Sequence, residues 1–196
     1  MKTLAQLREL GLFDARVPRY TSYPTAPHFK NTVGNDSVTR WIKAIPSNGT
    51  VSVYVHVPFC RRLCWFCACR TQGTATAGPV AAYVETLKHE LAVVKPLLAP
   101  GVKIEHLHFG GGTPTLLQPD MISDLTAAIF DMAPLAEDAQ FSVEIDPTEV
   151  DEDRIAAFAD AGLTRASNGV PDFAPLIQDT SGRPPNYDLT RHAVQP

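Results

Sequence analysis

Three cysteines within eight residues carry the most specific chemistry of this sequence. Cys60, Cys64 and Cys67 follow the apolar run Val51–Val57, which is typical of a buried strand. Three thiolates delivered into one loop suit a group that needs three sulfur ligands and leaves one position open. An iron–sulfur cube with one uncommitted iron has this requirement, because cysteine thiolates hold such clusters. Cys69 lies two residues beyond Cys67 and needs a separate explanation.

Zinc and disulfides are the two other uses of clustered cysteines. Structural zinc usually takes four ligands in paired short spacings; no second pair is present, although Cys69 or His56 could complete a tetrahedron. Disulfides need a secreted context, and the first nine residues contain no apolar core of signal-peptide length. No apolar stretch approaches the roughly 18 residues of a membrane span. We therefore expect a cytoplasmic protein, in which clustered cysteines bind metal or do redox work.

Length and charge narrow the function classes. The 196 residues, 44% of them hydrophobic, are enough for one domain with its own core. The net charge is −4, so the composition gives no sign of a nucleic-acid footprint or of attraction to an anionic membrane. Neither nucleic acid nor membrane is expected as a partner.

Hydrophobic periodicity predicts the elements that must position the cysteines. Leu4, Leu7 and Leu10 are spaced for a short helix that Gly11 ends, and residues 37–45 predict another. The chain then alternates between strands predicted at 51–57, 104–109, 141–145 and 164–167 and helices predicted at 79–98, 119–132 and 151–161. Such repeats imply parallel strands with right-handed crossovers. Sites in these folds lie at the carboxyl ends of the strands.

The stretch Tyr54–Cys69 closely resembles the radical S-adenosylmethionine (SAM) superfamily. Within it, the match is to the oxygen-independent coproporphyrinogen III oxidases, also called coproporphyrinogen dehydrogenases. The similarity covers residues from about Pro18 to Arg183, in blocks that keep the family's order: Pro18–Thr25, His108–Thr115, Ser142–Pro147 and Arg165–Val170. The resemblance implies an α/β fold, a partial (β/α) radical SAM barrel over residues 51–196. An arm of helical and extended segments over residues 1–50 precedes it.

The resemblance also implies two cofactors, a [4Fe–4S] cluster and SAM. It places Cys60, Cys64 and Cys67 on three irons and leaves the fourth iron to the amino and carboxylate groups of SAM. Cleavage of SAM then gives a 5′-deoxyadenosyl radical, a reaction in which the cofactor carries the chemistry and the protein positions it. Cys69 is not a ligand in this family, and by itself it is equally compatible with a small buried residue.

Seven further residues match SAM contacts of the family. Tyr54 corresponds to the contact with the methionine end, Phe66 to one with an adenine or with a second SAM, Gly111 to one with the amino group, Gly112 and Thr113 to a second SAM, Glu144 to a ribose, and Arg183 to the second SAM. The three glycines from Gly110 let the backbone approach a ligand closely. Their loop lacks the lysine of a nucleotide-binding P-loop.

The implied reaction is the oxidative decarboxylation of two propionates of coproporphyrinogen III to vinyl groups, giving protoporphyrinogen IX. It needs an electron donor and an acceptor that the sequence does not identify, and full-length members of the family are expected to be monomers. Arginine and hydroxyl groups suit propionates, and the arm offers Arg19, Tyr20, Thr21 and Tyr23 as candidates.

The sequence departs from the family at three points. Pro171 stands where the family has a glutamine that helps hold the second SAM, and Asn168 stands where it prefers an apolar residue. Family members are also more than twice this length, which predicts a barrel truncated after about four strands. We expect an N-terminal fragment or the product of a decayed gene, with doubtful activity.

Two other functions stay open. A haem-carrying chaperone on the same barrel would bind haem without oxidase activity, although the arm Pro18–Thr25 and Cys69 disfavour it. A simple iron–sulfur electron carrier would hold a cluster and would not cleave SAM. Haem titration distinguishes the first from the oxidase, and a SAM-cleavage assay distinguishes the second.

Overall fold

The computed structural model describes residues 3–11, 23–65, 67, 69–182 and 187–194. The chain divides into two compact units, residues 1–38 and 39–196. In the first unit, α1 (Leu4–Glu9) begins with a capping box in which Thr3 and Gln6 exchange hydrogen bonds, and Gly11 follows it with φ 70°. The helix predicted there is confirmed. A short 3-10 turn, η1, covers Ala26–His28.

The second unit contains a four-stranded parallel sheet in the order β1-β4-β5-β6. Its strands are β1 (Thr50–Val57), β4 (Lys103–Gly111), β5 (Leu135–Ile145) and β6 (Arg165–Asn168). At the carboxyl end of the sheet Val57 pairs with Gly111, and Ile145 pairs with Asn168. The sheet thus brings the ends of four separate sequence blocks together, and the predicted partial barrel of parallel strands is confirmed.

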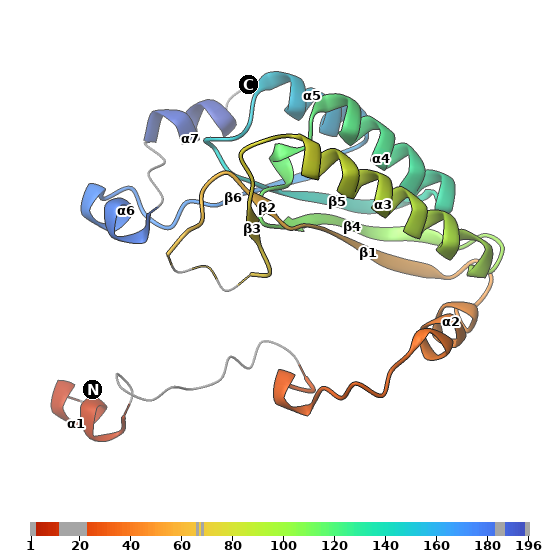
Figure 1. Ribbon diagram of the computed structural model, residues 1–196, viewed down its shortest axis with the longest axis horizontal. Helices are drawn as coiled ribbons and strands as arrows, with labels where there is room; N and C mark the ends of the chain where they lie inside the picture. Colours follow the sequence, from red (N-terminus) through yellow and green to blue (C-terminus); the bar gives the residue numbers. More distant parts are fainter. Residues whose placement is uncertain (1–2, 12–22, 66, 68, 183–186, 195–196) are drawn as a thin grey trace. The chain divides into compact units, whose positions relative to one another are not determined.

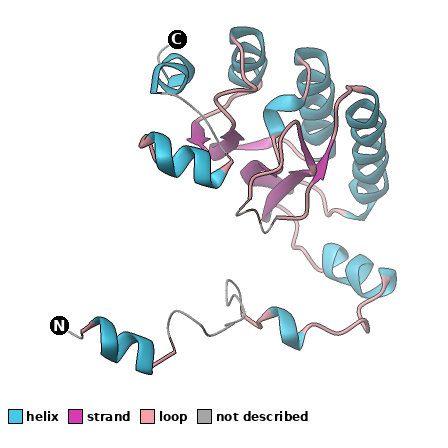
Figure 2. Ribbon diagram, turned by 60° about the vertical axis from the view of Figure 1, so that its left-hand side comes forward, coloured by secondary structure: helices cyan, strands magenta, loops and turns pink. Residues whose placement is uncertain are grey.

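Three helices connect these strands and lie on one face of the sheet (Figures 1 and 2). They are α3 (Gly78–Val94), α4 (Pro119–Met132) and α5 (Glu152–Asp160), and α4 packs between the other two. Parallel sheets need such cover because both of their faces carry apolar side chains. In α4, Ile122, Leu125 and Ile129 are fully buried, which makes this helix the centre of the apolar layer.

Aromatic side chains fix the position of α5 against the sheet. Phe158 of α5 meets Phe109 of β4 edge to face at 5.6 Å between ring centroids, and it meets Phe141 of β5 at 6.1 Å. All three rings are fully buried. Because Phe109 immediately precedes the glycine run, this packing extends to the residues that begin the candidate site.

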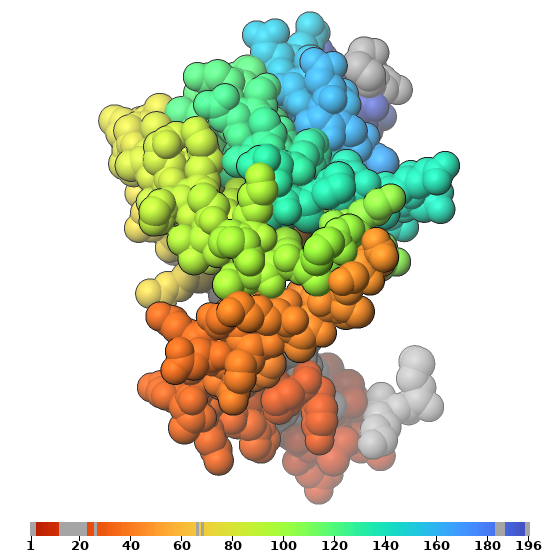
Figure 3. Space-filling model, turned by 90° about the vertical axis from the view of Figure 1, so that its right-hand side faces the viewer, coloured from red at the N-terminus to blue at the C-terminus, as the bar shows by residue number. Residues whose placement is uncertain are grey.

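At the other end of the sheet, the segment before β1 packs on the turn before β4 (Figure 3). The amide of Asn48 donates to the carbonyl of Pro100 over 3.0 Å, and the amide of Lys103 donates to Gly49 over 3.0 Å. These bonds lie within the second unit and join the residues just before β1 to those just before β4. The helix α2 (Asn35–Lys43) precedes them and starts two residues before the predicted 37–45.

Several predicted boundaries differ from the structure for local reasons. The helix α3 ends at Val94, because Pro96 interrupts it and residues 95–97 form the 3-10 turn η2 (Lys95–Leu97). The strand β5 starts at Leu135 instead of residue 141, since Ile104 pairs with Leu135 before a register shift. The predicted helix 119–132 has the observed bounds of α4.

Besides η1 and η2, four short elements of the described chain were not predicted. They are β2 (Phe59–Cys60), β3 (Gln72–Gly73), η3 (Pro114–Leu116) and α6 (Pro175–Ser181). The last helix of the described chain is α7 (Tyr187–Val194). Among the described residues, no helix is long and apolar enough to cross a membrane.

Candidate functional site: a cysteine loop at the end of the parallel sheet

A two-strand parallel ladder closes the cysteine loop at its base. Phe59 and Cys60 of β2 pair with Gln72 and Gly73 of β3. The amide of Thr74 donates to the carbonyl of Cys60 over 2.9 Å. The ladder therefore fixes the backbone of the first cysteine and holds together the two ends of the segment between β2 and β3.

Cys60 is the buried member of the set. It is the last residue of β2, and 8% of it is exposed. Burial raises the pKa of the Cys60 thiol, and a hydrogen bond with the Thr113 side chain acts in the opposite direction. The thiols of Cys67 and Cys64 raise that pKa further, so the sulfurs of the loop sense one another's charge. A bound metal ion reverses this balance because it deprotonates coordinating thiols.

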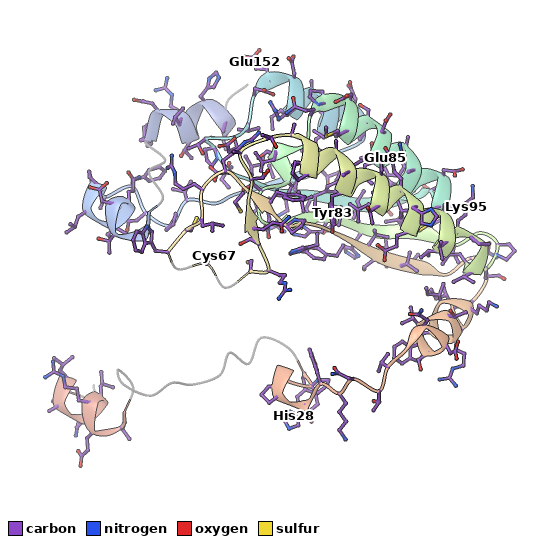
Figure 4. The ribbon with its side chains drawn as sticks, viewed as in Figure 1. His28, Cys67, Tyr83, Glu85, Lys95 and Glu152 are labelled. Atoms are coloured by element: carbon purple, nitrogen blue, oxygen red, sulfur yellow. The ribbon has the colours of Figure 1, made fainter. Side chains whose placement is uncertain are left out.

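Cys64 and Cys67 stand at the two ends of a tight turn. The amide of Cys67 donates to the carbonyl of Cys64 over 3.1 Å. Cys64 is half-buried, whereas Cys67 is exposed on the loop (Figure 4). None of Cys60, Cys64, Cys67 and Cys69 forms a disulfide. Within the described part of the chain, no three histidine, cysteine or acidic groups are drawn into a metal-binding arrangement.

The glycine run lies beside Cys60 and contacts the neighbouring strand. The amide of Gly111 donates to Oε2 of Glu144 over 3.2 Å, and Gly111 has φ 113°, a conformation that favours glycine. Val143 and Ile145 are buried, whereas Glu144 points the other way and is exposed. The carboxylate thus avoids the cost of burial and lies where a ligand at the strand ends can reach it.

A layer of aromatic and imidazole rings continues from Glu144 to β1. Nε2 of His108 lies 3.5 Å from Oε1 of Glu144, and Nδ1 of His108 lies 2.7 Å from the Ser142 hydroxyl. The Tyr54 ring stacks on His108 with 5.6 Å between centroids and 14° between planes. Partial burial, followed by the Glu144 charge, raises the pKa of the Tyr54 hydroxyl. Tyr54 therefore stays protonated as a hydrogen-bonding group.

His56 links Tyr54 to the cysteine loop. Its Nε2 lies 2.8 Å from the carbonyl oxygen of Arg70, which can only accept. In the neutral ring Nδ1 must then accept, and the Tyr54 hydroxyl donates to it over 3.0 Å. The Tyr83 hydroxyl from α3 donates to the His56 carbonyl over 2.9 Å (Figure 4). His56 therefore has its ring and its backbone fixed from two elements.

A small polar cavity of about 80 Å³ lies beside Cys64. It is lined by Arg61, Arg62, Cys64, Thr113, Asp146, Thr148, Glu149 and Gly182. Burial, followed by the nearby Asp146 charge, raises the pKa of Glu149, and Arg61 is the first of the arginines that oppose this shift. The cavity thus combines both charge signs next to a candidate ligand. Sequence reasoning missed Glu149, because nothing in its spacing marks it.

The structure brings five of the seven predicted SAM contacts to one end of the sheet: Tyr54, Gly111, Gly112, Thr113 and Glu144. The other two, Phe66 and Arg183, lie outside the described residues, as do Arg19, Tyr20 and Thr21 of the arm. Tyr23 is described and almost fully exposed. The roles of all these residues stay predictions. Asn168 is half-buried at the end of β6, and its Oδ1 is buried without a hydrogen-bond partner in the described structure.

The donor set fits an iron–sulfur cluster. Three free thiols share one loop, and its first sulfur lies against the glycine run. A Cβ built at Gly112 would stand 2.9 Å from Sγ of Cys60, so a side chain there would crowd the sulfur. The site is thus rich in soft sulfur ligands and has backbone that a second molecule can approach closely.

Comparison with known proteins gives the family. The radical SAM superfamily profile matches residues 54–195. The chain belongs to the radical SAM superfamily. A [4Fe–4S] cluster and SAM are the cofactors of that superfamily, as the sequence predicted. Cys60, Cys64 and Cys67 stay the predicted ligands of the cluster.

Two curated relatives share the name oxygen-independent coproporphyrinogen III oxidase. The one from Paracoccus denitrificans is 58% identical over 99% of this chain, and one from Cereibacter sphaeroides is 55% identical over all of it. Each alignment covers 43% of the relative. A solved structure, coproporphyrinogen III oxidase (HemN) from Escherichia coli, described as a radical SAM enzyme, superposes with a TM-score of 0.81. It is 32% identical, and the match covers 97% of this chain and 41% of that one. The chain therefore spans less than half the length of the proteins it resembles.

Proposed function

We propose that this chain carries the cluster- and SAM-binding half of an oxygen-independent coproporphyrinogen III oxidase. Its reaction would be the oxidative decarboxylation of two propionates of coproporphyrinogen III to vinyl groups, with release of carbon dioxide. One observation carries the proposal: the 58% identity to a relative of that name extends over 99% of the chain. The alignment spans the cysteine loop, the glycine run and the Glu144 block together.

A bound cluster would supply the electron for the reductive cleavage of SAM. The protein's own part is to position the reactants. Cys60 would hold one corner rigidly because the β2–β3 ladder and Thr113 fix it. Cys64 and Cys67 would hold two others from the ends of one turn.

The remaining groups at the strand ends would orient SAM. Glu144 accepts from the Gly111 amide and has further lone pairs for a ribose hydroxyl. In the proposed arrangement the Tyr54 hydroxyl donates its hydrogen bond to His56. Its oxygen is then free to accept a hydrogen bond from the ammonium group of the methionine end of SAM. Gly112 and Thr113 would approach a second SAM, together with Phe66 and Arg183. The substrate's propionates would meet arginine or hydroxyl groups of the arm.

The surroundings are part of the proposal. We place the protein in the cytoplasm, where cysteines stay reduced, acting as a monomer with a separate electron donor and acceptor. Cleavage of each SAM takes up one electron, which the donor supplies. Each propionate gives one hydrogen atom to the resulting radical and one further electron as carbon dioxide leaves, and the acceptor takes that electron.

The test is anaerobic reconstitution of the chain with iron and sulfide, followed by reduction in the presence of SAM. The expected products are 5′-deoxyadenosine and methionine. Loss of carbon dioxide from added coproporphyrinogen III would show that this half of the enzyme also turns over the substrate. Cys64→Ser should lose most of the bound iron, whereas Cys69→Ser should keep it. Unchanged iron in Cys64→Ser would contradict the ligand assignment. Haem binding without SAM cleavage would favour the chaperone function instead, and a stable cluster that leaves SAM intact would favour an electron carrier.

A further inference from the structure

The turn between two candidate ligands contacts a distant helix. Trp65 follows Cys64 directly, and its amide donates to the carbonyl of Ser181 over 3.2 Å. Ser181 is the last residue of α6. Because the same turn is closed by the bond from Cys67 to Cys64, the last turn of α6 holds the backbone between two of the three cysteines.

The Trp65 side chain makes a second contact with this helix end. A Cβ built at Gly182 would overlap Cδ1 and Nε1 of the indole. The contact involves one edge of the ring, since 85% of Trp65 is exposed. The indole also borders a surface hollow with Leu176, Ile177, Thr180 and Ser181. The ring thus rests on bare backbone at the one residue of this helix end that has no side chain.

Gly182 is suited to this place in its own conformation. It terminates α6 in the left-handed region, with φ 65° and ψ 22°, and its amide donates to Asp179 over 3.2 Å. Glycine adopts such a C-terminal conformation without a steric penalty. Gly182 also lines the polar cavity beside Cys64, so it adjoins the cysteine loop on two sides.

The helix end is itself anchored to the segment after β6. The buried side chain of Gln178 donates through Nε2 to the carbonyl of Asp172 over 3.0 Å. Oδ1 of Asp172 accepts from the Ala174 amide over 2.7 Å. A continuous series of contacts therefore runs from the β6–α6 segment through α6 to the turn that carries Cys64 and Cys67.

We propose that Gly182 is a positioning residue for the cysteine loop: α6 clamps the Cys64–Cys67 turn through Ser181 and Trp65, and only a residue without a Cβ at 182 admits the indole. The proposal deepens the proposed function, on which the importance of the turn for the cluster rests. The contacts of Ser181 and Gly182 with Trp65, however, are present before any iron binds.

Gly182→Ala tests the clamp, and Gly162→Ala is its matched control. Both glycines end a helix with positive φ, 65° and 94°, but a Cβ at Gly162 would meet only Leu135 Cδ1 at 3.8 Å. Both variants therefore strain the backbone, and only Gly182→Ala displaces Trp65. Circular dichroism of each variant shows whether it is folded.

The first measurement is trypsin cleavage of the metal-free full chain after Arg61, Arg62 and Arg70, which flank the turn. Cleavage after Lys103 at the start of β4 serves as an internal reference. Loop cleavage in Gly182→Ala should rise about threefold or more relative to that reference, because local opening becomes easier. Gly162→Ala should leave the ratio near that of the wild type. The same ratio in both glycine variants would overturn the clamp.

The second measurement is the amount of iron and sulfide bound after reconstitution. Wild type, Gly182→Ala, Trp65→Ala and the double variant are compared as a double-mutant cycle. Gly182→Ala should lower the cluster content, whereas adding it to Trp65→Ala should change neither content nor loop cleavage further. An additive loss in the double variant would overturn the role of the indole. If loop cleavage rises in Gly182→Ala but the wild type does not cleave SAM, the proposed function is contradicted and the clamp is still supported.

Discussion

Gly112 lies directly against the sulfur that begins the cluster motif. A Cβ on it would stand 2.9 Å from Cys60 Sγ and 2.6 Å from the carbonyl oxygen of Phe59. The Phe59 oxygen belongs to the backbone of the β2–β3 ladder and cannot move aside as a flexible side chain would. The glycine run and the first cysteine are therefore fitted to each other before a ligand is present.

Gly112→Ala should consequently damage both the fold and the site. We expect a loss of about 1–3 kcal/mol in the free energy of unfolding, typical of overpacking, and a lower iron content after reconstitution. Urea unfolding of the metal-free chain measures the first quantity. Gly78→Ala is the control: a Cβ there meets nothing within 4 Å at the start of α3, so stability should stay equal or rise by up to about 1 kcal/mol. Equal stability of wild type and Gly112→Ala would contradict the close fit.

The sequence predicted the main sheet because its strands are apolar and each carries a recognisable block at its carboxyl end. It did not predict β2 and β3, since elements of two residues have no periodicity to detect. The first half of β5 was missed for a related reason. Residues 136–140 contain two acidic side chains and a glutamine, so they show no hydrophobic pattern. They lie at the register shift between Leu135, which pairs with Ile104, and Gln140, which pairs with His106.

The Glu144 carboxylate gives a prediction for SAM affinity. Glu144→Gln keeps an oxygen for the Gly111 amide but removes the charge, so we expect SAM to bind about tenfold or more weakly, as for lost hydrogen bonds to charged groups. Equilibrium dialysis with the reconstituted chain measures the affinity. Glu105→Gln, at the opposite end of the sheet where Glu105 accepts from Thr50 over 2.9 Å, should bind SAM like the wild type. An equal loss of SAM affinity in both variants would mean that the net charge of the protein, and not a contact of Glu144 with SAM, causes the effect.

Glu149 gives a prediction for stability against pH. Burial raises its pKa in the folded chain, so the folded state holds the proton more tightly than the unfolded state. The stabilising contribution is complete below the ordinary value of 4.5 and is lost as the pH rises through the folded pKa. At pH 7 the ionised carboxylate is therefore unfavourable, and Glu149→Gln should raise the melting temperature by roughly 1–2 °C.

This gain should vanish below about pH 4.5, where the wild-type carboxyl is protonated in both states. Glu152→Gln provides the comparison, because Glu152 is an exposed carboxylate in the first turn of α5. Its removal should lower the melting temperature slightly at pH 7, since acidic groups stabilise helix N-termini. Melting curves across pH 4–8 measure both effects. A gain for Glu149→Gln that persists at low pH would exclude ionisation as its cause.

The sequence predicts those site residues that belong to a recognisable sequence segment. It does not predict contacts between residues of distant segments. The three cysteines, the glycine run and Glu144 each stand out in their own segments. The contact between Trp65 and Gly182 joins residues more than a hundred positions apart, and no local pattern in either segment points to the other. Only the structure shows that His56 joins Tyr54 to the cysteine loop and that His108 joins Tyr54 to Glu144.

Phe158 should be the side chain through which α5 stabilises the glycine run. It is fully buried between Phe109 and Phe141, so Phe158→Ala should cost about 3–5 kcal/mol of stability. Phe158→Leu keeps most of the volume and should cost less. Phe173→Ala is the matched control, because Phe173 is 47% exposed and contacts Tyr187 at the surface; its cost should be within about 1 kcal/mol. Because Phe109 leads directly into Gly110, hydrogen exchange of the Gly111 amide should also quicken in Phe158→Leu. An unchanged exchange rate of the Gly111 amide would show that the aromatic core does not stabilise the glycine run.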